Sequence, residues 1–108
     1  MALDYSELIE DIIQKRYENS STGQVRVEKV IDRENQHYLL IQVGWMNDKW
    51  YYGNLLHLDI IDGKIHIQQN NTEDLIAQKL VDLGVPKTDI VLGFHAPFER
   101  QFTEYALG

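Results

Sequence analysis

Hydrophobic residues near the start of the chain recur with the period of a helix. Asp4, followed three residues later by Glu7, has the form of a capping box at a helix N-terminus. The apolar stripe beyond it consists of Leu8, Ile9, Ile12, Ile13 and Tyr17. Because this spacing places apolar side chains on one face of a helix, it predicts a helix over residues 3–17, followed by a polar loop at 18–23.

Over residues 24–69 the apolar period falls to two, which is typical of half-buried β-strands. Short polar turns divide this stretch into four runs, at 24–32, 37–45, 49–60 and 64–69. Sequential strands joined by short turns form an antiparallel meander. The third run is long for one strand, and Gly53 is expected to mark a bend or bulge within it.

The second run carries apolar residues on both of its faces. Tyr38 and Leu40 lie on one face. The other face consists of Leu39, Ile41, Val43 and Trp45. This pattern predicts a strand inside the sheet that is covered on at least part of each side.

The third and fourth runs are joined by Asp62-Gly63, a strong indication of a two-residue hairpin turn. Such a turn predicts five cross-strand pairs, namely Ile61–Lys64, Ile60–Ile65, Asp59–His66, Leu58–Ile67 and His57–Gln68. Side chains alternate across a strand, so the apolar face consists of Leu58, Ile60, Ile65 and Ile67. The polar face consists of His57, Asp59, His66 and Gln68.

The following segment predicts a central helix and a short strand. The capping residues 71–74 precede a helix expected over residues 72–83. Gly84 and Pro86 end this helix in the usual order. The apolar run at 89–94 is typical of a buried strand.

Pro97 is suited to the first position of a last helix, whose apolar residues are Phe98, Phe102 and Tyr105. Together the patterns predict a single α+β domain over residues 1–108. Its antiparallel sheet has four or five strands, packed with N-terminal, central and C-terminal helices.

Composition narrows the function classes. The net charge is −7 at pH 7, and the ten basic residues are scattered, which argues against direct binding of nucleic acid. The absence of cysteine excludes disulfides, thiolate catalysis and cysteine-based zinc sites. No apolar stretch approaches the length of a membrane span, and the N-terminus has no signal-peptide pattern, so we expect a cytoplasmic protein.

His57, Asp59 and His66 are the residues of the polar hairpin face that could bind a metal or act in catalysis. Three ligands of this kind need a fourth group and supporting hydrogen bonds before they hold an ion. The alternative is a solvated or partner-facing sheet surface, with a favourable Asp–His cross-strand pair. The surface interpretation is favoured, so no metal, cofactor or catalytic residue is expected. A metal-dependent hydrolase that uses these three residues remains the alternative.

Aromatic residues and a C-terminal histidine are candidates for a partner interface. Trp45, Trp50 and Tyr51 lie around one turn, and residues of this kind either fill cores or occupy interfaces. His95 and Arg100 lie near the junction of the last strand and last helix. There His95 could act as a general base or contact a partner through a charge pair, but the favoured interpretation is that it ties the junction by hydrogen bonds. Open sheet edges and exposed aromatics lead us to predict a symmetric homodimer.

Three stretches of the chain resemble the XisI family, the fdxN element excision controlling factor. They are VGW at 43–45, HLDIIDGKIHIQQNNTED at 57–74 and LVDLGVPKTDIVLGFHAPFERQFTEYA at 80–106. The resemblance covers nearly the whole chain. His66 departs from the family pattern, because an aromatic residue is more usual there. The resemblance therefore adds no support to a site built on His66.

What the resemblance implies is a small cytoplasmic α+β protein without catalytic residues or cofactors. Such a protein takes part in programmed excision of a DNA element, together with an XisH-like factor and a site-specific recombinase. An acidic protein in this process is expected to bind a protein partner rather than DNA phosphates. The alternative is a weak nucleic-acid-binding module whose basic residues converge in the fold, namely Arg26, Lys29, Arg33 and Lys49.

Overall fold

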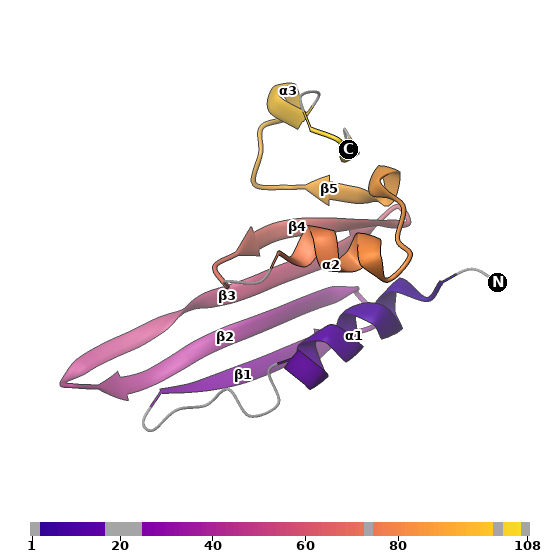
Figure 1. Ribbon diagram of the computed structural model, residues 1–108. Helices are drawn as coiled ribbons and strands as arrows, with labels where there is room; N and C mark the ends of the chain where they lie inside the picture. Colours follow the sequence, from indigo (N-terminus) through magenta and orange to yellow (C-terminus); the bar gives the residue numbers. More distant parts are fainter. Residues whose placement is uncertain (1–2, 17–24, 73–74, 101–102, 107–108) are drawn as a thin grey trace.

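The computed structural model describes residues 3–16, 25–72, 75–100 and 103–106, and it has the predicted α+β architecture (Figure 1). The elements in chain order are α1 (Tyr5–Arg16), β1 (Val25–Asp32), β2 (His37–Met46), β3 (Lys49–Ile61), β4 (Lys64–Asn70), α2 (Ile76–Asp82), the 3-10 turn η1 (Lys87–Asp89), β5 (Ile90–Leu92) and α3 (Pro97–Arg100).

The strands form one five-stranded sheet in the order β1-β2-β3-β4-β5. The predicted antiparallel meander is confirmed for β1 to β4. The expectation of a wholly antiparallel sheet is wrong at its edge, because β5 pairs with β4 in parallel. The physical reason is the crossover through α2, which returns the chain to the end of the sheet where β4 began.

The Asp62-Gly63 turn has the predicted geometry, since both residues have positive φ, of 52° and 77°. The predicted register is confirmed from Ile61–Lys64 to Leu58–Ile67. It fails at His57, which is opposite Gln69 because a bulge leaves Gln68 as an extra residue.

A second irregularity lies within β3, a single strand of 13 residues. Leu40 is opposite Leu56, whereas the next residue, Ile41, is opposite Asn54. Leu55 is therefore the extra residue of a β-bulge. The sequence placed this irregularity at Gly53, two residues away.

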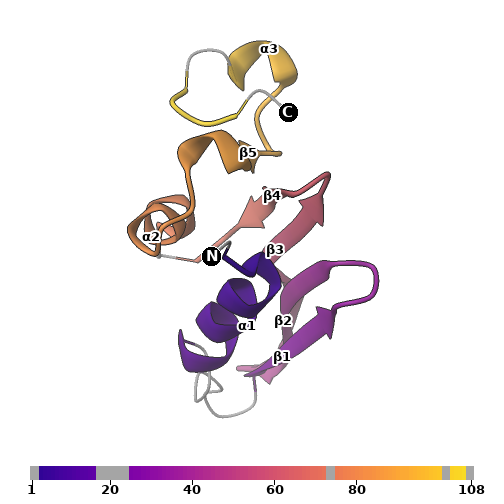
Figure 2. The same cartoon turned by 90° about the vertical axis from the view of Figure 1, so that its right-hand side faces the viewer.

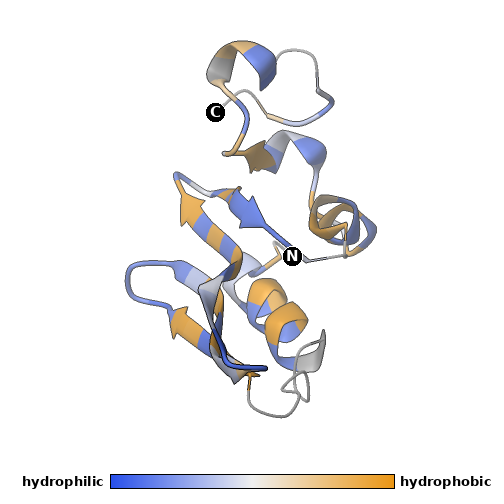
Figure 3. Cartoon of the chain, turned by 90° about the vertical axis from the view of Figure 1, so that its left-hand side faces the viewer, coloured by the Kyte–Doolittle hydropathy of each residue, from blue (hydrophilic) through white to orange (hydrophobic). Residues whose placement is uncertain are grey.

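The hydrophobic core lies on one face of the sheet, which α1 and α2 cover from the same side (Figure 2). Hydrophobic and hydrophilic residues alternate along the strands on which these two helices pack (Figure 3). Fully burying one such aliphatic side chain contributes about 1.5–3 kcal/mol. The central buried residues are Ile9, Ile13, Tyr38, Leu40, Leu56, Leu58, Ile65, Ile76 and Leu80.

The opposite face of β2 differs from the expectation of cover on both sides. Leu39, Ile41 and Val43 are only half-buried there, and Trp45 is exposed. Among the described elements, α1 and α2 both pack on the Tyr38 side, so no helix covers this row.

The helix ends show which capping predictions hold. The backbone N–H of Glu7 donates to Oδ1 of Asp4 at 3.2 Å, as predicted for α1. Gly84, with φ of 105°, follows the end of α2 as expected. However, α2 begins at Ile76, because Leu75 is its N-cap, and the predicted capping residues 73–74 lie outside the described residues.

The last helix is shorter than predicted. α3 ends at Arg100, and Phe102 lies outside the described residues. Tyr105 follows the helix and packs against the core, while the neighbouring Ala106 bridges to Val91. No helix in the described ranges is long and apolar enough to cross a membrane.

A hydrogen bond between distant segments ties α1 to η1. The Tyr5 hydroxyl donates to Oδ2 of Asp89 at 2.6 Å. This bond to a carboxylate, together with burial, raises the pKa of Tyr5 to about 12. Because the folded-state pKa lies above the ordinary value of 10.0, the stabilisation is fully present below pH 10 and is lost as the pH rises through 12.

We therefore predict that Tyr5→Phe lowers the free energy of unfolding by about 1–2 kcal/mol, with the same difference at any pH between about 6 and 9. Urea denaturation at several pH values measures this difference. Tyr52→Phe is the control, because Tyr52 is 71% exposed. A loss for Tyr5→Phe no larger than that of the control would show that the bond contributes nothing to stability.

Candidate functional site

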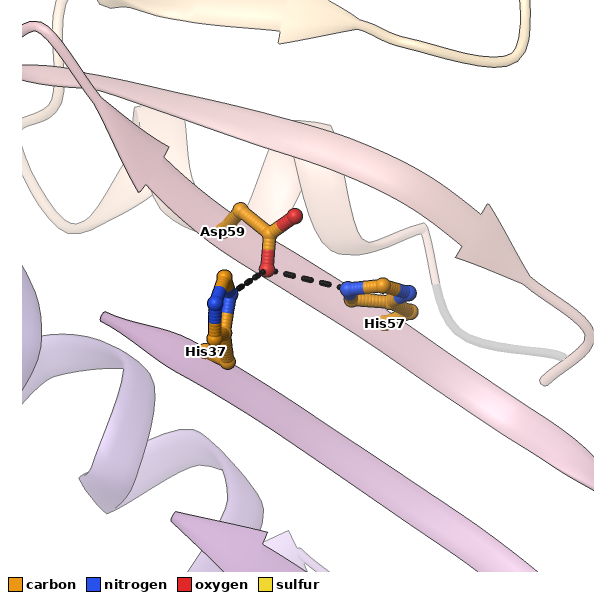
Figure 4. Close-up of side chains that lie close together, drawn as sticks. All are labelled: His37, His57 and Asp59. Atoms are coloured by element: carbon orange, nitrogen blue, oxygen red, sulfur yellow. Dashed lines mark hydrogen bonds and ion pairs between the residues drawn. The ribbon is translucent and has the colours of Figure 1, made fainter. Parts of the chain in front are cut away.

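Three polar side chains meet on the sheet face opposite the core. His57 and Asp59 lie two positions apart on β3, so they point to the same side. His37, at the start of β2, is directly opposite Asp59. Nδ1 of His37 and Nε2 of His57 both hydrogen-bond to Oδ1 of Asp59, at 2.8 and 2.9 Å (Figure 4).

The sequence predicted a group of His57, Asp59 and His66, and the structure brings only two of these together. In the described part of the chain, the potential ligand atoms that lie within 4.8 Å of one another belong to His37, His57 and Asp59. His66 is opposite Asp59, as the hairpin register predicted, but it is not part of this set. Burial and the nearby charge of Arg100 lower the pKa of His66.

His37 was missed because its position depends on the bulge in β3. Near the Asn47-Asp48 turn, Met46 is opposite Lys49. Continuing that register without interruption would place His37 opposite Leu58. The extra residue, Leu55, advances β3 by one position and brings Asp59 opposite His37.

Asp59 is a buried charged residue, with 8% of its surface exposed. Burial raises the pKa of its carboxyl, but hydrogen bonds from His37, His57 and Gln68 outweigh this effect and leave the pKa below its ordinary value. An ionised carboxylate only accepts, so both ring nitrogens that face it donate. Asp59 is therefore a carboxylate at neutral pH, held by donors from three strands.

Gln68 holds the second oxygen of this carboxylate. Its Nε2 donates to Oδ2 of Asp59 at 3.3 Å. The Gln68 side chain lies against Gly93, where an added Cβ would be 2.3 Å from Oε1 of Gln68. The glycine after β5 therefore leaves the space that Gln68 occupies.

The same face of the sheet carries a row of exposed and half-buried apolar residues, which we call the open face. It consists of Val30, Leu39, Ile41, Val43, Trp45, Trp50 and Tyr52. Trp45 and Trp50 are 57% and 54% exposed, and their ring centroids are 5.4 Å apart. Tyr51 is half-buried and lies on the other side of β3. The two tryptophans lie near the end of the β2–β3 hairpin, which projects beyond the helices in Figure 1.

His95 and Arg100 lie away from the open face, at the junction of β5 and α3. The backbone N–H of His95 donates to the Leu92 carbonyl, and Nε of Arg100 donates to the His95 carbonyl, at 3.0 and 3.1 Å. The His95 ring also lies 3.4 Å from a carboxylate oxygen of Glu99. These bonds tie the strand to the helix.

Of the four basic residues of the nucleic-acid alternative, the two arginines are paired with carboxylates, and Lys29 is exposed on β1. Arg26 pairs with Glu28 at 3.0 Å, and Arg33 pairs with Glu10. Lys49 is exposed at the far end of the β2–β3 hairpin. Both arginines are thus matched with carboxylates.

We predict that Gln68→Ala raises the pKa of Asp59 towards its ordinary value of 3.8, because one of the hydrogen bonds that lower it is lost. A lowered folded-state pKa gives stabilisation that is present above the unfolded value and is lost as the pH falls through the folded value. The variant should therefore lose this contribution at a higher pH than the parent chain.

NMR titration of the Asp59 carboxyl resonance measures the shift. Gln69→Ala is the matched control, because Gln69 is the exposed neighbour of Gln68. Equal Asp59 titration curves for the two variants would contradict the role given to Gln68.

Comparisons with known proteins agree with the fold and with one another. The family model described as "XisI protein" matches residues 2–107. A XisI-like protein from Anabaena variabilis ATCC 29413, whose crystal structure is known, is 40% identical in sequence to this chain. The two structures superpose with a TM-score of 0.90, and 96% of each chain is covered. The fdxN element excision controlling factor XisI from the same organism is 36% identical, with a TM-score of 0.84 and 96% of each chain covered. No curated protein matches the chain.

Proposed function

The chain belongs to the XisI family, and we propose that it is a non-enzymatic, cytoplasmic controlling factor that influences excision of a DNA element by binding a protein partner. One solved relative, 36% identical over 96% of the chain, is named an fdxN element excision controlling factor. A controlling role is compatible with a protein that acts through contacts rather than through a reaction of its own.

The observation that carries the proposal is the open face. Large exposed apolar patches on small domains usually mark contact sites, and tryptophan and tyrosine are enriched at interfaces. Trp45, Trp50 and Tyr52 are each more than half exposed. Cross-strand packing of the two tryptophans stabilises the hairpin locally, yet it leaves most of their surface available to a partner.

Charge indicates what kind of partner fits. A net charge of −7 repels DNA phosphates and attracts a basic protein surface. Arg26 and Arg33 are paired with glutamates, so they offer little free positive charge. The partner we propose is an XisH-like factor or the recombinase itself, bound through a basic surface with an apolar centre.

We predict that Trp50→Ala weakens binding of the partner by about 30-fold or more, which corresponds to the roughly 2 kcal/mol of an interface hot spot. Calorimetric titration with the purified XisH-like factor and with the recombinase measures the affinity. Phe98→Ala is the control, because Phe98 is 70% exposed but lies on α3, outside the open face.

Two results would contradict the proposal. One is equal partner affinity for Trp50→Ala and the parent chain. The other is tight binding of duplex DNA at near-physiological salt that weakens steeply as salt is added, since this dependence is typical of phosphate neutralisation.

The homodimer expected from the sequence stays a prediction. Its interface would be the tryptophan end of the open face, so a second copy and the excision partner would compete for that surface. Light scattering at micromolar concentration should then give twice the 12.6 kDa mass of one chain, and Trp50→Ala should reduce it. A single-chain mass for the parent protein would contradict the dimer and leave the open face to the excision partner.

A further inference from the structure

Two imidazole nitrogens and one carboxylate converge at the start of β2. We propose that His37, His57 and Asp59 form a binding site for a zinc ion or a chemically similar divalent transition-metal ion. The site differs from the one considered from the sequence, because His37 takes the place of His66. Its three ligands lie on the same sheet face as the open-face row, with His57 opposite Leu39, but they are not members of that row, so each can be tested with its own variants.

The separations of the ligand atoms fit such an ion. Tetrahedral zinc has bonds of about 2.0–2.2 Å to nitrogen and oxygen, so its ligand atoms lie about 3.3–3.5 Å apart. The two N···O distances are 2.8 and 2.9 Å, and all three ligand atoms lie within 4.8 Å of one another. To admit the ion, the two N···O distances would lengthen by about half an ångström, and the two ring nitrogens would lie about 3.3–3.5 Å from each other.

Side-chain exposure allows that movement and gives the ion access. The Asp59 side chain is 11% exposed and the His57 side chain 30%, so the sheet holds these two ligands in place. The His37 side chain is 51% exposed and can turn towards solvent. Three protein ligands leave a fourth position for water.

The surroundings orient the carboxylate as metal sites require. Gln68 donates to the second oxygen of Asp59, and bonds of this kind to a ligating group support metal affinity. Asp32, opposite His37 on β1, accepts hydrogen bonds from the backbone and side chain of Asn35 at 3.1 and 3.0 Å.

The ligand types select the class of ion. Imidazole nitrogens suit zinc, nickel, copper and iron, whereas calcium and magnesium prefer sites made of oxygen. On binding, the proton that each ring directs at Asp59 moves to the other ring nitrogen through solvent, and no redox change is involved. The bound ion would join β2 to β3 next to the bulge.

The test is calorimetric titration of the full chain, without a polyhistidine tag, with zinc chloride at about pH 7.5, because metal ligands bind in their deprotonated form. We expect one ion per chain and a higher melting temperature with zinc. His37→Gln and His57→Gln should each weaken binding by more than about 100-fold, beyond the 10–100-fold typical of a lost supporting group. Magnesium chloride should give no heat and no shift.

Matched controls use the other two histidines of the chain. His66→Gln removes the cross-strand neighbour of Asp59, and His95→Gln removes a distant ring, so both should bind zinc as the parent does. Should a ligand variant fail to fold, the parent chain is loaded with cobalt(II) instead. Intense visible ligand-field absorption that zinc abolishes is then expected.

Three outcomes would overturn the proposal. These are no zinc binding by the parent chain, unchanged affinity in His37→Gln and His57→Gln, or an equal loss in His66→Gln. Because Trp50→Ala should bind zinc normally, failure of the metal site can be distinguished from failure of the proposed partner surface.

Discussion

The β-bulge at Leu55 is the constraint on which both surfaces of this protein depend. A one-residue shift of register exchanges the two faces of a strand. Along β3, Asn54 comes before the bulge and is opposite Ile41, whereas Leu56 comes after it and is opposite Leu40. One extra residue therefore decides which side chains of β3 meet the helices and which meet solvent.

Because the faces of β3 switch at the bulge, one end of this long strand carries exposed aromatic residues and the other end carries core residues. Trp50 and Tyr52, before the bulge, lie on the open face, whereas Leu56 and Leu58, after it, are fully buried under the helices. A regular strand would keep all four side chains on one side. The hairpin can thus extend an exposed aromatic end beyond the core while its other end holds the domain together.

The polar cluster results from two bulges acting together. The bulge at Leu55 brings His37 opposite Asp59, and the second bulge leaves Gln68 as the extra residue of β4. Gln68 then reaches the second oxygen of Asp59 because Gly93 leaves space for it. Burying a carboxylate is costly unless its lone pairs are satisfied, and these donors satisfy them. The cluster is consequently a property of the sheet register rather than of any local motif.

The sequence by itself determined the parts of this protein that local rules govern. The period-two runs, the Asp62-Gly63 turn and the end of α2 at Gly84 follow from alternation and backbone preference within a few residues. Only the tertiary structure decided that β5 pairs in parallel, that His37 rather than His66 joins His57 and Asp59, and that Trp45 and Trp50 rather than Tyr51 lie on the exposed side of the hairpin. These outcomes depend on strand register across the bulges and on which face the helices cover. The strand register and the choice of covered face are both set by packing between segments that lie far apart in the chain. No short stretch of residues encodes that packing.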